Sequence, residues 1–181
     1  ILPVEKYKIT AGAKVSFTNT RNGINYDTSD PTLVQDDYFR YKEQIYALYA
    51  DYSREYSERF SMQLGLRMEH TRTTGISEAK DTEDKHDYTR LFPTVYLLYS
   101  PTDGHALNFS FSNRISRPSQ NMVNPFPFYQ NKYTYACGRE DLKPSYTYNA
   151  ELGYTLKNNF NVSAYYSYSD DVFFQVVDLD A

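Results

Sequence analysis

The chain has 181 residues, enough for one domain of ordinary size, and a formal net charge of −4. An acidic chain in which no basic cluster stands out argues against a nucleic-acid partner. The single cysteine excludes an internal disulfide framework and a multi-cysteine zinc site. The sequence contains no run of 18 apolar residues, so it predicts no membrane-spanning helix. Its 20 Tyr and 11 Phe suit β-strands.

Alternation of apolar and polar residues predicts an all-β fold without a convincing helix. Seven strands follow in chain order: about 8–18, 39–53, 60–72, 88–100, 106–115, 145–156 and 160–177. Because successive side chains of a strand point to opposite sides, each predicted strand has one apolar and one polar face. The pattern predicts an antiparallel meander of about seven long strands, a segment of a transmembrane β-barrel.

The strand predicted at 60–72 has the clearest pattern. Apolar side chains stand at every second position, and polar or small residues lie between them: Phe60, Met62, Leu64, Leu66 and Met68. Ordinary strands run about 5–6 residues, whereas a tilted strand that crosses a bilayer needs roughly 9–11. The length of this alternation therefore favours a membrane strand.

The connections between the predicted strands alternate in length. Long loops are expected at about 19–38, 73–87 and 116–144, and the turns between the remaining strands are short. In an antiparallel meander, alternate connections lie at opposite ends, so all the long loops gather at one end. Short periplasmic turns opposite long extracellular loops are typical of bacterial outer-membrane barrels.

Alternation alone does not say which face is apolar. Soluble barrels place apolar residues inside, whereas membrane barrels turn them toward lipid and keep a polar lumen. Long strands, segregated loops and tyrosines near strand ends favour the membrane barrel, because tyrosine rings settle at lipid–water interfaces. The candidate lumen-facing residues are then Gln63, Arg67, Glu69, Asn108, Arg114, Asn149 and Glu151.

An odd number of strands suggests a piece of a larger barrel. Bacterial single-chain barrels have even strand numbers, and large plugged transporters have about 22. The strands at 8–18 and 160–177 should therefore be open edges that do not pair with each other.

Several short motifs resemble a known family. They are Arg117-Pro118-Ser119, Asn124-Pro125-Phe126, Gly138 with Leu142-Lys143-Pro144, Leu66-Arg67 with Glu69, and Leu91-Phe92-Pro93. In this order they resemble the barrel of TonB-dependent outer-membrane receptors, and in particular the outer membrane protein beta-barrel family of Bacteroidetes. The chain departs from that pattern at Gly138-Arg139-Glu140, where the family has Gly-Asn-Pro. The turn before Leu142 is therefore expected to differ in shape.

The resemblance implies a place in the bacterial outer membrane and a function. The chain would form part of the wall of a transporter that imports a siderophore, cobalamin, glycan or peptide. Its partners would be outer-membrane lipid, the nutrient, and a plug domain and TonB, whose contact segments are not among these residues. The loop at 116–144 would cap the barrel mouth, with the ligand-contact candidates Phe126, Phe128, Tyr129, Tyr133 and Tyr135. The alternative is a non-transporting surface adhesin or a soluble β-barrel binding protein.

Residues for chemistry are scarce. The three histidines, His70, His86 and His105, have no second ligand at metal-binding spacing, and the acidic residues near 81–87 lack a calcium-loop pattern. No nucleophile elbow, phosphate-binding loop or dinucleotide fingerprint occurs. The expectation is therefore a protein that is not an enzyme and that uses no metal or cofactor.

Overall fold

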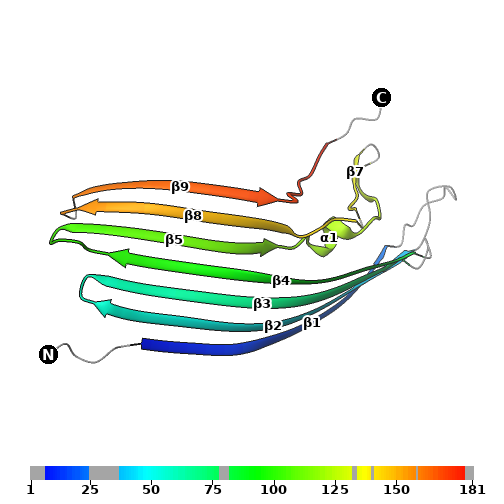
Figure 1. Cartoon of the computed structure of the whole chain (residues 1–181). Coiled ribbons are helices and arrows are strands. Elements are labelled where there is room, and N and C mark those ends of the chain that lie inside the picture. Colours follow the sequence, from blue (N-terminus) through cyan, green and yellow to red (C-terminus); the bar gives the residue numbers. More distant parts are fainter. Residues whose placement is uncertain are drawn as a thin grey trace.

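The fold is an open sheet of long antiparallel strands (Figure 1). The computed structural model describes residues 7–24, 37–77, 82–131, 134–139, 141–157 and 159–177. Its elements are β1 (Tyr7–Ile24), β2 (Asp37–Ser57), β3 (Phe60–Ser77), β4 (Thr82–Tyr99), β5 (His105–Ser116), α1 (Gln120–Val123), β6 (Phe128–Asn131), β7 (Thr134–Ala136), β8 (Ser145–Leu156) and β9 (Phe160–Asp170). This confirms the predicted all-β class.

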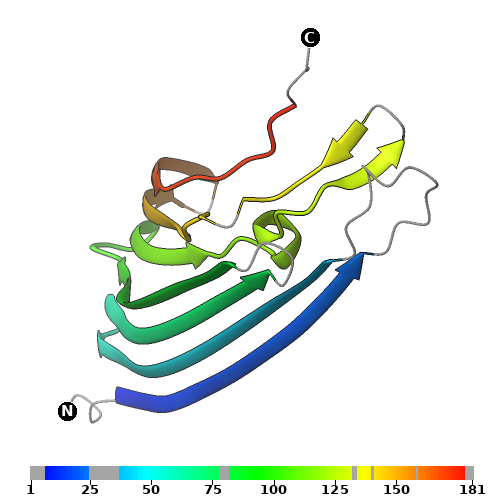
Figure 2. The same cartoon turned by 90° about the vertical axis from the view of Figure 1, so that its right-hand side faces the viewer.

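Seven strands form one sheet in the order β1-β2-β3-β4-β5-β8-β9, while β6 and β7 form a separate hairpin. Every neighbouring pair in the sheet is antiparallel. Figure 2 shows this order from β1, in blue, to β9. Within the described residues β1 and β9 are the two edges and do not pair with each other, as predicted.

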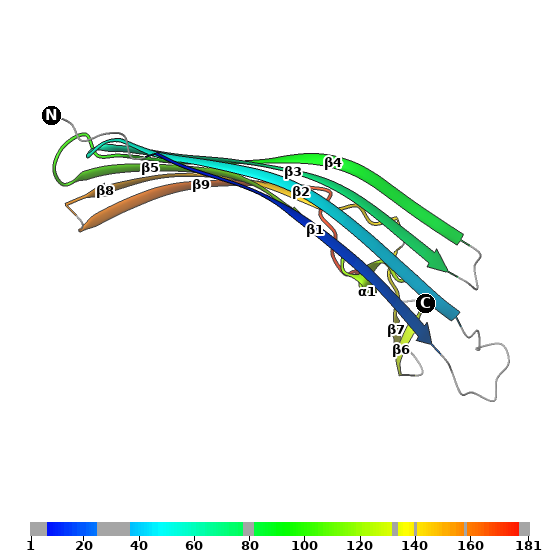
Figure 3. The ribbon, with the colours of Figure 1, turned by 90° about the horizontal axis from the view of Figure 1, so that it is seen from below.

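The sheet is curved, and its two faces differ. Figure 3 shows α1 and the β6–β7 hairpin on the concave side. The register places Leu66 of β3 between Ala50 and Pro93, and Arg67 between Tyr49 and Phe92. The apolar side chains on the face that carries Leu66 are largely exposed. Among them are Ile9, Val15, Phe17, Leu48, Leu64, Leu66, Met68, Leu91, Leu152 and Val162. This face is the convex one.

The convex apolar residues form a belt of membrane height. On β3 the belt runs from Phe60 to Met68. That stretch is roughly 27 Å along the strand and roughly 21 Å along the membrane normal at a tilt of about 40°, against an apolar band of about 25 Å in known barrels. On β1 the belt reaches Phe17, which is level with Arg72, four residues beyond Met68. Such a step across the sheet is expected when strands are tilted.

The predicted loop at 73–87 is wrong over most of its length, and the predicted loop at 19–38 is wrong at its two ends, while residues 25–36 lie outside the described residues. The strand β1 continues to Ile24 and β2 begins at Asp37, while β3 and β4 leave only residues 78–81 between them. Charged residues fit these strand ends because they pair: Arg72 Nε lies 2.9 Å from Asp87 Oδ2, across the β3–β4 ladder. Beyond the belt both faces are in water, so charges on either face are compatible with a strand.

Two further boundaries need correction. The strand predicted at 160–177 ends at Asp170, because Asp171 adopts a φ of 52° and turns the chain out of the extended conformation. The predicted loop at 116–144 contains α1 and the β6–β7 hairpin, although no helix was expected. The helix is short: a backbone N–H of Asn124 donates to Gln120 at its end.

Candidate functional site

The described residues between β5 and β8, which are 117–131, 134–139 and 141–144, fold onto the concave face and are called the inner segment (Figure 3). The last β4–β5 pair is Thr94 with Ser112, whereas the β5–β8 ladder continues to Ser116. The strands β5 and β8 thus separate from β4 at this end. The start of β8 packs over β4, where the rings of Phe92 and Tyr146 stack at 6.5 Å and are both buried.

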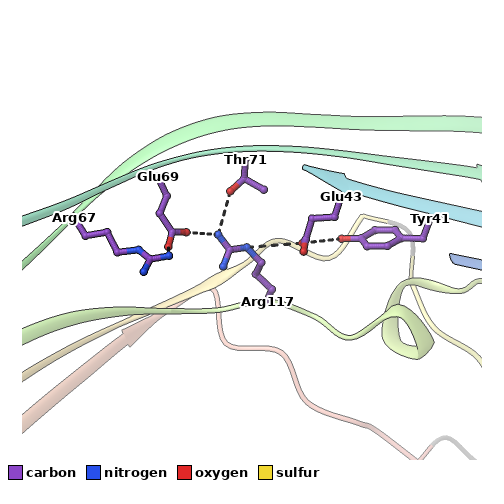
Figure 4. Close-up of polar contacts among 6 residues, drawn as sticks. All are labelled: Tyr41, Glu43, Arg67, Glu69, Thr71 and Arg117. Atoms are coloured by element: carbon purple, nitrogen blue, oxygen red, sulfur yellow. Dashed lines mark hydrogen bonds and ion pairs between the residues drawn. The ribbon is translucent and has the colours of Figure 1, made fainter. Parts of the chain in front are cut away.

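Arg117, the first residue of the inner segment, joins it to the wall (Figure 4). Its Nη2 donates to Glu69 Oε2 at 2.6 Å and to Thr71 Oγ1 at 3.1 Å. Its Nε lies 3.9 Å from Glu43 Oε1. Arg67 forms a second ion pair with Glu69. We call these residues, with Tyr41, the Arg117 cluster.

The charges of the Arg117 cluster balance, with two guanidinium groups against the carboxylates of Glu69 and Glu43. Glu69 is 5% exposed and Thr71 is fully buried. Burial lowers the pKa of the Arg117 guanidinium, but the hydrogen bonds and charge interactions with Glu69 and Tyr88 together outweigh it and leave the pKa raised. The Tyr41 hydroxyl donates to Glu43 at 3.4 Å. Removing one partner from such a set leaves an uncompensated buried charge, so the cluster fixes where the inner segment begins.

The rest of the inner segment is held by apolar and backbone contacts. Val123 of α1 is buried, and the ring of Phe126 meets Phe39 of β2 edge-on at 6.2 Å. The backbone N–H of Gly138 donates to Asn124 at 2.7 Å. A Cβ at Gly138 would collide with the Met122 carbonyl and lie 2.7 Å from the Asn124 oxygen, so the close approach requires glycine. The motif residues Asn124, Phe126 and Gly138 therefore make the contacts that hold the inner segment in place.

Two hollows lie on the concave face. One, of about 40 Å³, lies between the inner segment and β2–β4 and is lined by residues that include Tyr41, His86, Tyr88, Arg117 and Pro144. It has room for a few waters at most, since one water needs roughly 10–15 Å³. The other, of about 530 Å³, lies toward the short turns, and its lining includes Gln63, Tyr96, Asn108 and Ser110.

The structure brings some of the predicted lumen-facing residues together. Arg67 and Glu69 belong to the Arg117 cluster, whereas Gln63 and Asn108 line the larger hollow. Asn149 Oδ1 accepts hydrogen bonds from Tyr165 at 2.5 Å and Ser167 at 2.8 Å. Glu151 lies opposite Ser110 in the register, and Arg114 is exposed near the end of β5. Strand alternation and register place them on the concave face.

The predicted ligand-contact aromatics differ in how exposed their side chains are. Phe126 faces the wall and is half-buried, whereas Phe128 is 63% exposed and Tyr135 49%. The side chain of Tyr129 and the whole of Tyr133 lie outside the described residues. Among the aromatic side chains of this set that the structure describes, those on the β6–β7 hairpin are thus the exposed ones.

Sequence reasoning missed the wall-side partners of Arg117. Tyr41 and Glu43 follow buried Phe39 at every second position, on the same face of β2. Polar residues that share a face with a buried apolar residue were a signal for a buried polar contact. Arg117 itself was noticed only as part of a motif, and its partner Glu69 is 48 residues away.

The histidines form separate pairs. His70 bonds Thr89 at 3.0 Å, His86 bonds Asp84 at 3.0 Å, and His105 bonds the Tyr154 hydroxyl at 2.7 Å. Within the described part of the chain, no three His, Cys, Asp or Glu residues group to hold a metal. The described residues also contain no helix that is both long and apolar enough to cross a membrane.

A tilted antiparallel sheet with an apolar convex belt and a charged concave face is the wall of a transmembrane β-barrel. The family model described as "Outer membrane protein beta-barrel family" matches residues 1–181. The chain belongs to this family, and its place is the bacterial outer membrane. No curated protein sequence matches it.

Solved structures share the fold. The unliganded ferric citrate transporter FecA is 13% identical with a TM-score of 0.58, and the match covers 88% of this chain and 23% of FecA. The ferric yersiniabactin uptake receptor FyuA from Yersinia pestis is 17% identical with a TM-score of 0.58, covering 92% and 26%. A Serratia marcescens hemophore receptor, HasR, is 12% identical with a TM-score of 0.47, covering 83% and 30%. The chain thus spans about a quarter of FecA and FyuA and shares their fold, and the predicted resemblance to the outer membrane protein beta-barrel family is confirmed.

Proposed function

We propose that the chain is part of the wall of a TonB-dependent transporter that imports a nutrient across the outer membrane. The family match and the shared fold with FecA and FyuA support this reading. The nutrient belongs to one of four classes: siderophore, cobalamin, glycan or peptide. The motif pattern favours the Bacteroidetes branch of the family. Because the related structures are a transporter and receptors, a non-enzymatic role fits.

The observation that carries the proposal is the inner segment held against the concave wall. An adhesin needs no charged cluster inside its wall, whereas a transporter needs a lumen that is narrowed at one end. The Arg117–Glu69 contact of 2.6 Å holds the segment where it narrows the lumen on the side of the long loops. The concave face nearer the short turns is left polar and open, around the hollow of about 530 Å³. In the complete protein the plug domain would face this part of the lumen across water.

The ligand would meet the β6–β7 hairpin before it reaches the lumen. Phe128 and Tyr135 offer exposed rings there, suited to apolar or stacking contacts with a nutrient. The Arg117 cluster positions the hairpin rather than touching the ligand, since Glu69 is buried.

The test is growth of the source bacterium with its full-length gene intact or deleted, on limiting ferric siderophores, cobalamin, glycans or peptides. The proposal expects deletion to abolish growth on one of these nutrients, and deletion of tonB to abolish it equally. Growth on every nutrient without the gene, together with loss of cell adhesion, would favour the non-transporting alternative.

A variant links the growth test to the structure. Deleting residues 121–135 from the full-length gene should reduce uptake of that nutrient while the barrel still reaches the membrane. The matched control keeps the loop at full length and carries only the exposed substitution Lys143→Gln, which should leave uptake unchanged. Unchanged uptake and unchanged ligand affinity in the deletion would remove the inner segment from the mechanism.

A further inference from the structure

The ladder between β4 and β5 is much shorter than its neighbours. Register pairs join β4 to β5 only over residues 94–99, although β4 begins at Thr82 and pairs with β3 along its whole length. Figure 1 shows β4 running on past the end of β5. The residues of β5 after Ser112 pair with β8 alone. We call this junction, 90–93 on β4 against 113–116 on β5, the seam.

The sequence of β4 explains where the ladder stops. In an antiparallel strand the N–H and C=O of one residue point to the same side, and the side alternates along the strand. Ser100, which continues β4, donates its N–H to Arg59 on the β3 side. The odd-numbered residues of β4, Leu91 and Pro93 among them, therefore face β5. Because proline has no N–H, Pro93 interrupts the β4–β5 ladder directly beyond its last pair.

The side chain of Asn113 lies in the seam and takes the place of a ladder bond. Its Nδ2 donates to the Leu91 carbonyl at 3.5 Å, and Asn113 is only 9% exposed. Its Oδ1 is buried and has no hydrogen-bond partner among the described residues. A buried polar atom without a partner costs free energy, and such atoms are rare in native structures. The seam is therefore only partly satisfied in the observed arrangement.

The seam begins inside the apolar belt. Thr94, where the ladder stops, is level with Gly65, while the belt on β3 continues to Met68. Leu91 lies opposite Met68 and is 54% exposed. Lipid offers no hydrogen bonds to a strand edge, so unpaired backbone groups at this height are costly. The membrane therefore favours pairing across the seam.

A second arrangement of the seam follows from the register. Continued beyond the last pair, the register places Asn113 opposite Pro93 and Ile115 opposite Leu91. Asn113 would then donate its backbone N–H to the Pro93 carbonyl, and the N–H groups of Ile115 and Leu91 would each donate to the other's carbonyl. We call this arrangement zipped and the observed one docked.

The two arrangements exclude each other. In the docked arrangement, Tyr146 of β8 stacks on Phe92 at 6.5 Å, and Arg90 Cζ lies 4.9 Å from the centre of the Tyr146 ring. In the zipped arrangement, β8 would lie two strands from β4, about 10 Å away, so the stack would be lost. Arg117, which directly follows β5, would be drawn away from Glu69. Side chains thus stabilise docking, whereas backbone hydrogen bonds stabilise zipping.

We propose that the seam is a two-state switch in the wall, and that its docked and zipped arrangements set how far the inner segment narrows the lumen. Pairing across the seam withdraws the start of the inner segment from the concave face, and separation returns it. The motif Leu91-Phe92-Pro93 carries the switch. It supplies a carbonyl, the ring under Tyr146 and the missing N–H. The inference uses only the wall and its belt, so it stands or falls independently of nutrient import.

Disulfide trapping measures the zipped state in the full-length receptor in lipid vesicles. The trapping variant is Leu91→Cys/Ile115→Cys, with Cys137 and any other cysteine replaced by Ser, because opposed residues of a paired ladder lie within disulfide range. Adding Pro93→Val supplies the missing N–H, so the rate of cross-linking should rise about fivefold, as one added hydrogen bond predicts. The control, Thr94→Val, keeps its N–H and nearly its shape and should leave the rate unchanged.

Hydrogen exchange measures the docked state without cysteines. In Pro93→Val the backbone amides of the inner segment should exchange about fivefold faster, in step with the cross-linking rate, because the docked state is less populated. Unchanged cross-linking in a folded Pro93→Val receptor would overturn the switch. So would faster cross-linking that leaves the exchange of the inner segment unchanged.

A third variant decides the outcome if Pro93→Val does not fold. Arg117→Gln in the trapping variant weakens docking without touching the seam, so it should also speed cross-linking. The exposed Lys143→Gln is its control and should not. Equal cross-linking rates in these two variants would overturn the proposal.

Discussion

The two faces of β3 reverse the usual order of a water-soluble protein. On the convex face Met68 is 42% exposed, while its neighbour Glu69 on the concave face is 5% exposed. An apolar side chain stands outside and a charged one inside, one residue apart. The difference is explained when the outer medium is lipid and the inner face holds a polar partner, here the inner segment with Arg117. The same strand therefore meets two different environments.

The largest expected effect comes from breaking the convex face. Leu64 lies near the middle of the belt, where an arginine costs about 2–4 kcal/mol in a membrane barrel. Leu64→Arg in the full-length receptor should lower the free energy of unfolding from lipid vesicles by this amount, measured by urea titration. The control is Gln63→Arg on the concave face, which should change it little. Equal losses for the two variants would contradict the assignment of the faces.

Breaking the concave face should have an effect of similar size. Arg117→Gln leaves Glu69 buried with one cation fewer, a loss of about 3 kcal/mol by comparison with other buried pairs. Backbone amides of the inner segment should then exchange hydrogen about a hundredfold faster, read by mass spectrometry of the full-length receptor. The exposed Arg114→Gln is the matched control and should leave exchange unchanged. The same protection in both variants would mean that the ion pair does not hold the segment.

A backbone test sharpens the view of how the concave face is covered. Gly138→Ala places a Cβ against two carbonyl groups of the turn after α1, so the segment must shift at a cost of roughly 1–3 kcal/mol. Limited proteolysis should cut the inner segment faster in this variant. Gly23→Ala is the comparison, because its Cβ would meet only the ring of an exposed tyrosine. Slower cleavage of Gly138→Ala, or no change, would refute the tight turn.

The smallest effect is expected at the rim, where Arg139 donates to Asp141 at 2.9 and 2.7 Å in full solvent. The hydrogen bond lowers the pKa of the Asp141 carboxyl. Any stability from this pair is thus present above the ordinary carboxyl pKa and is lost as the pH falls through the lowered value. In the Arg139→Gln variant, backbone amide hydrogen exchange near Leu142 should lose only this dependence on pH in the acid range. A large change at neutral pH would show that the pair does more than lie at the surface.

The sequence predicted the sheet well because a period of two is a local property. Alternation from Phe60 onward was sufficient to predict β3 and its two faces, and alternation along the chain predicted the seven strands of the large sheet. The ends of β3 and β4 could not be predicted, because charged residues such as Asp87 indicate a loop until the register shows Arg72 opposite.

The Arg117 cluster was only half visible in the sequence. Arg67 and Glu69 stood out as charges on an alternating strand, but their partner lies in a segment without a period. Which wall residue Arg117 reaches depends on how β5 leaves β4, and that is a property of the tertiary structure. The motif signalled that Arg117 mattered without indicating its contact.

The most direct test of the two-face account measures the environment of adjacent residues. Nitroxide labels are placed singly at Leu64 and Gln63 of the full-length receptor in vesicles, with Cys137 replaced by Ser. Relaxation is then compared with oxygen, which concentrates in lipid, and with a water-soluble nickel complex. The account predicts that Leu64 responds mainly to oxygen and Gln63 mainly to nickel. A nickel response at Leu64 equal to that at Gln63, or the reverse order, would contradict it.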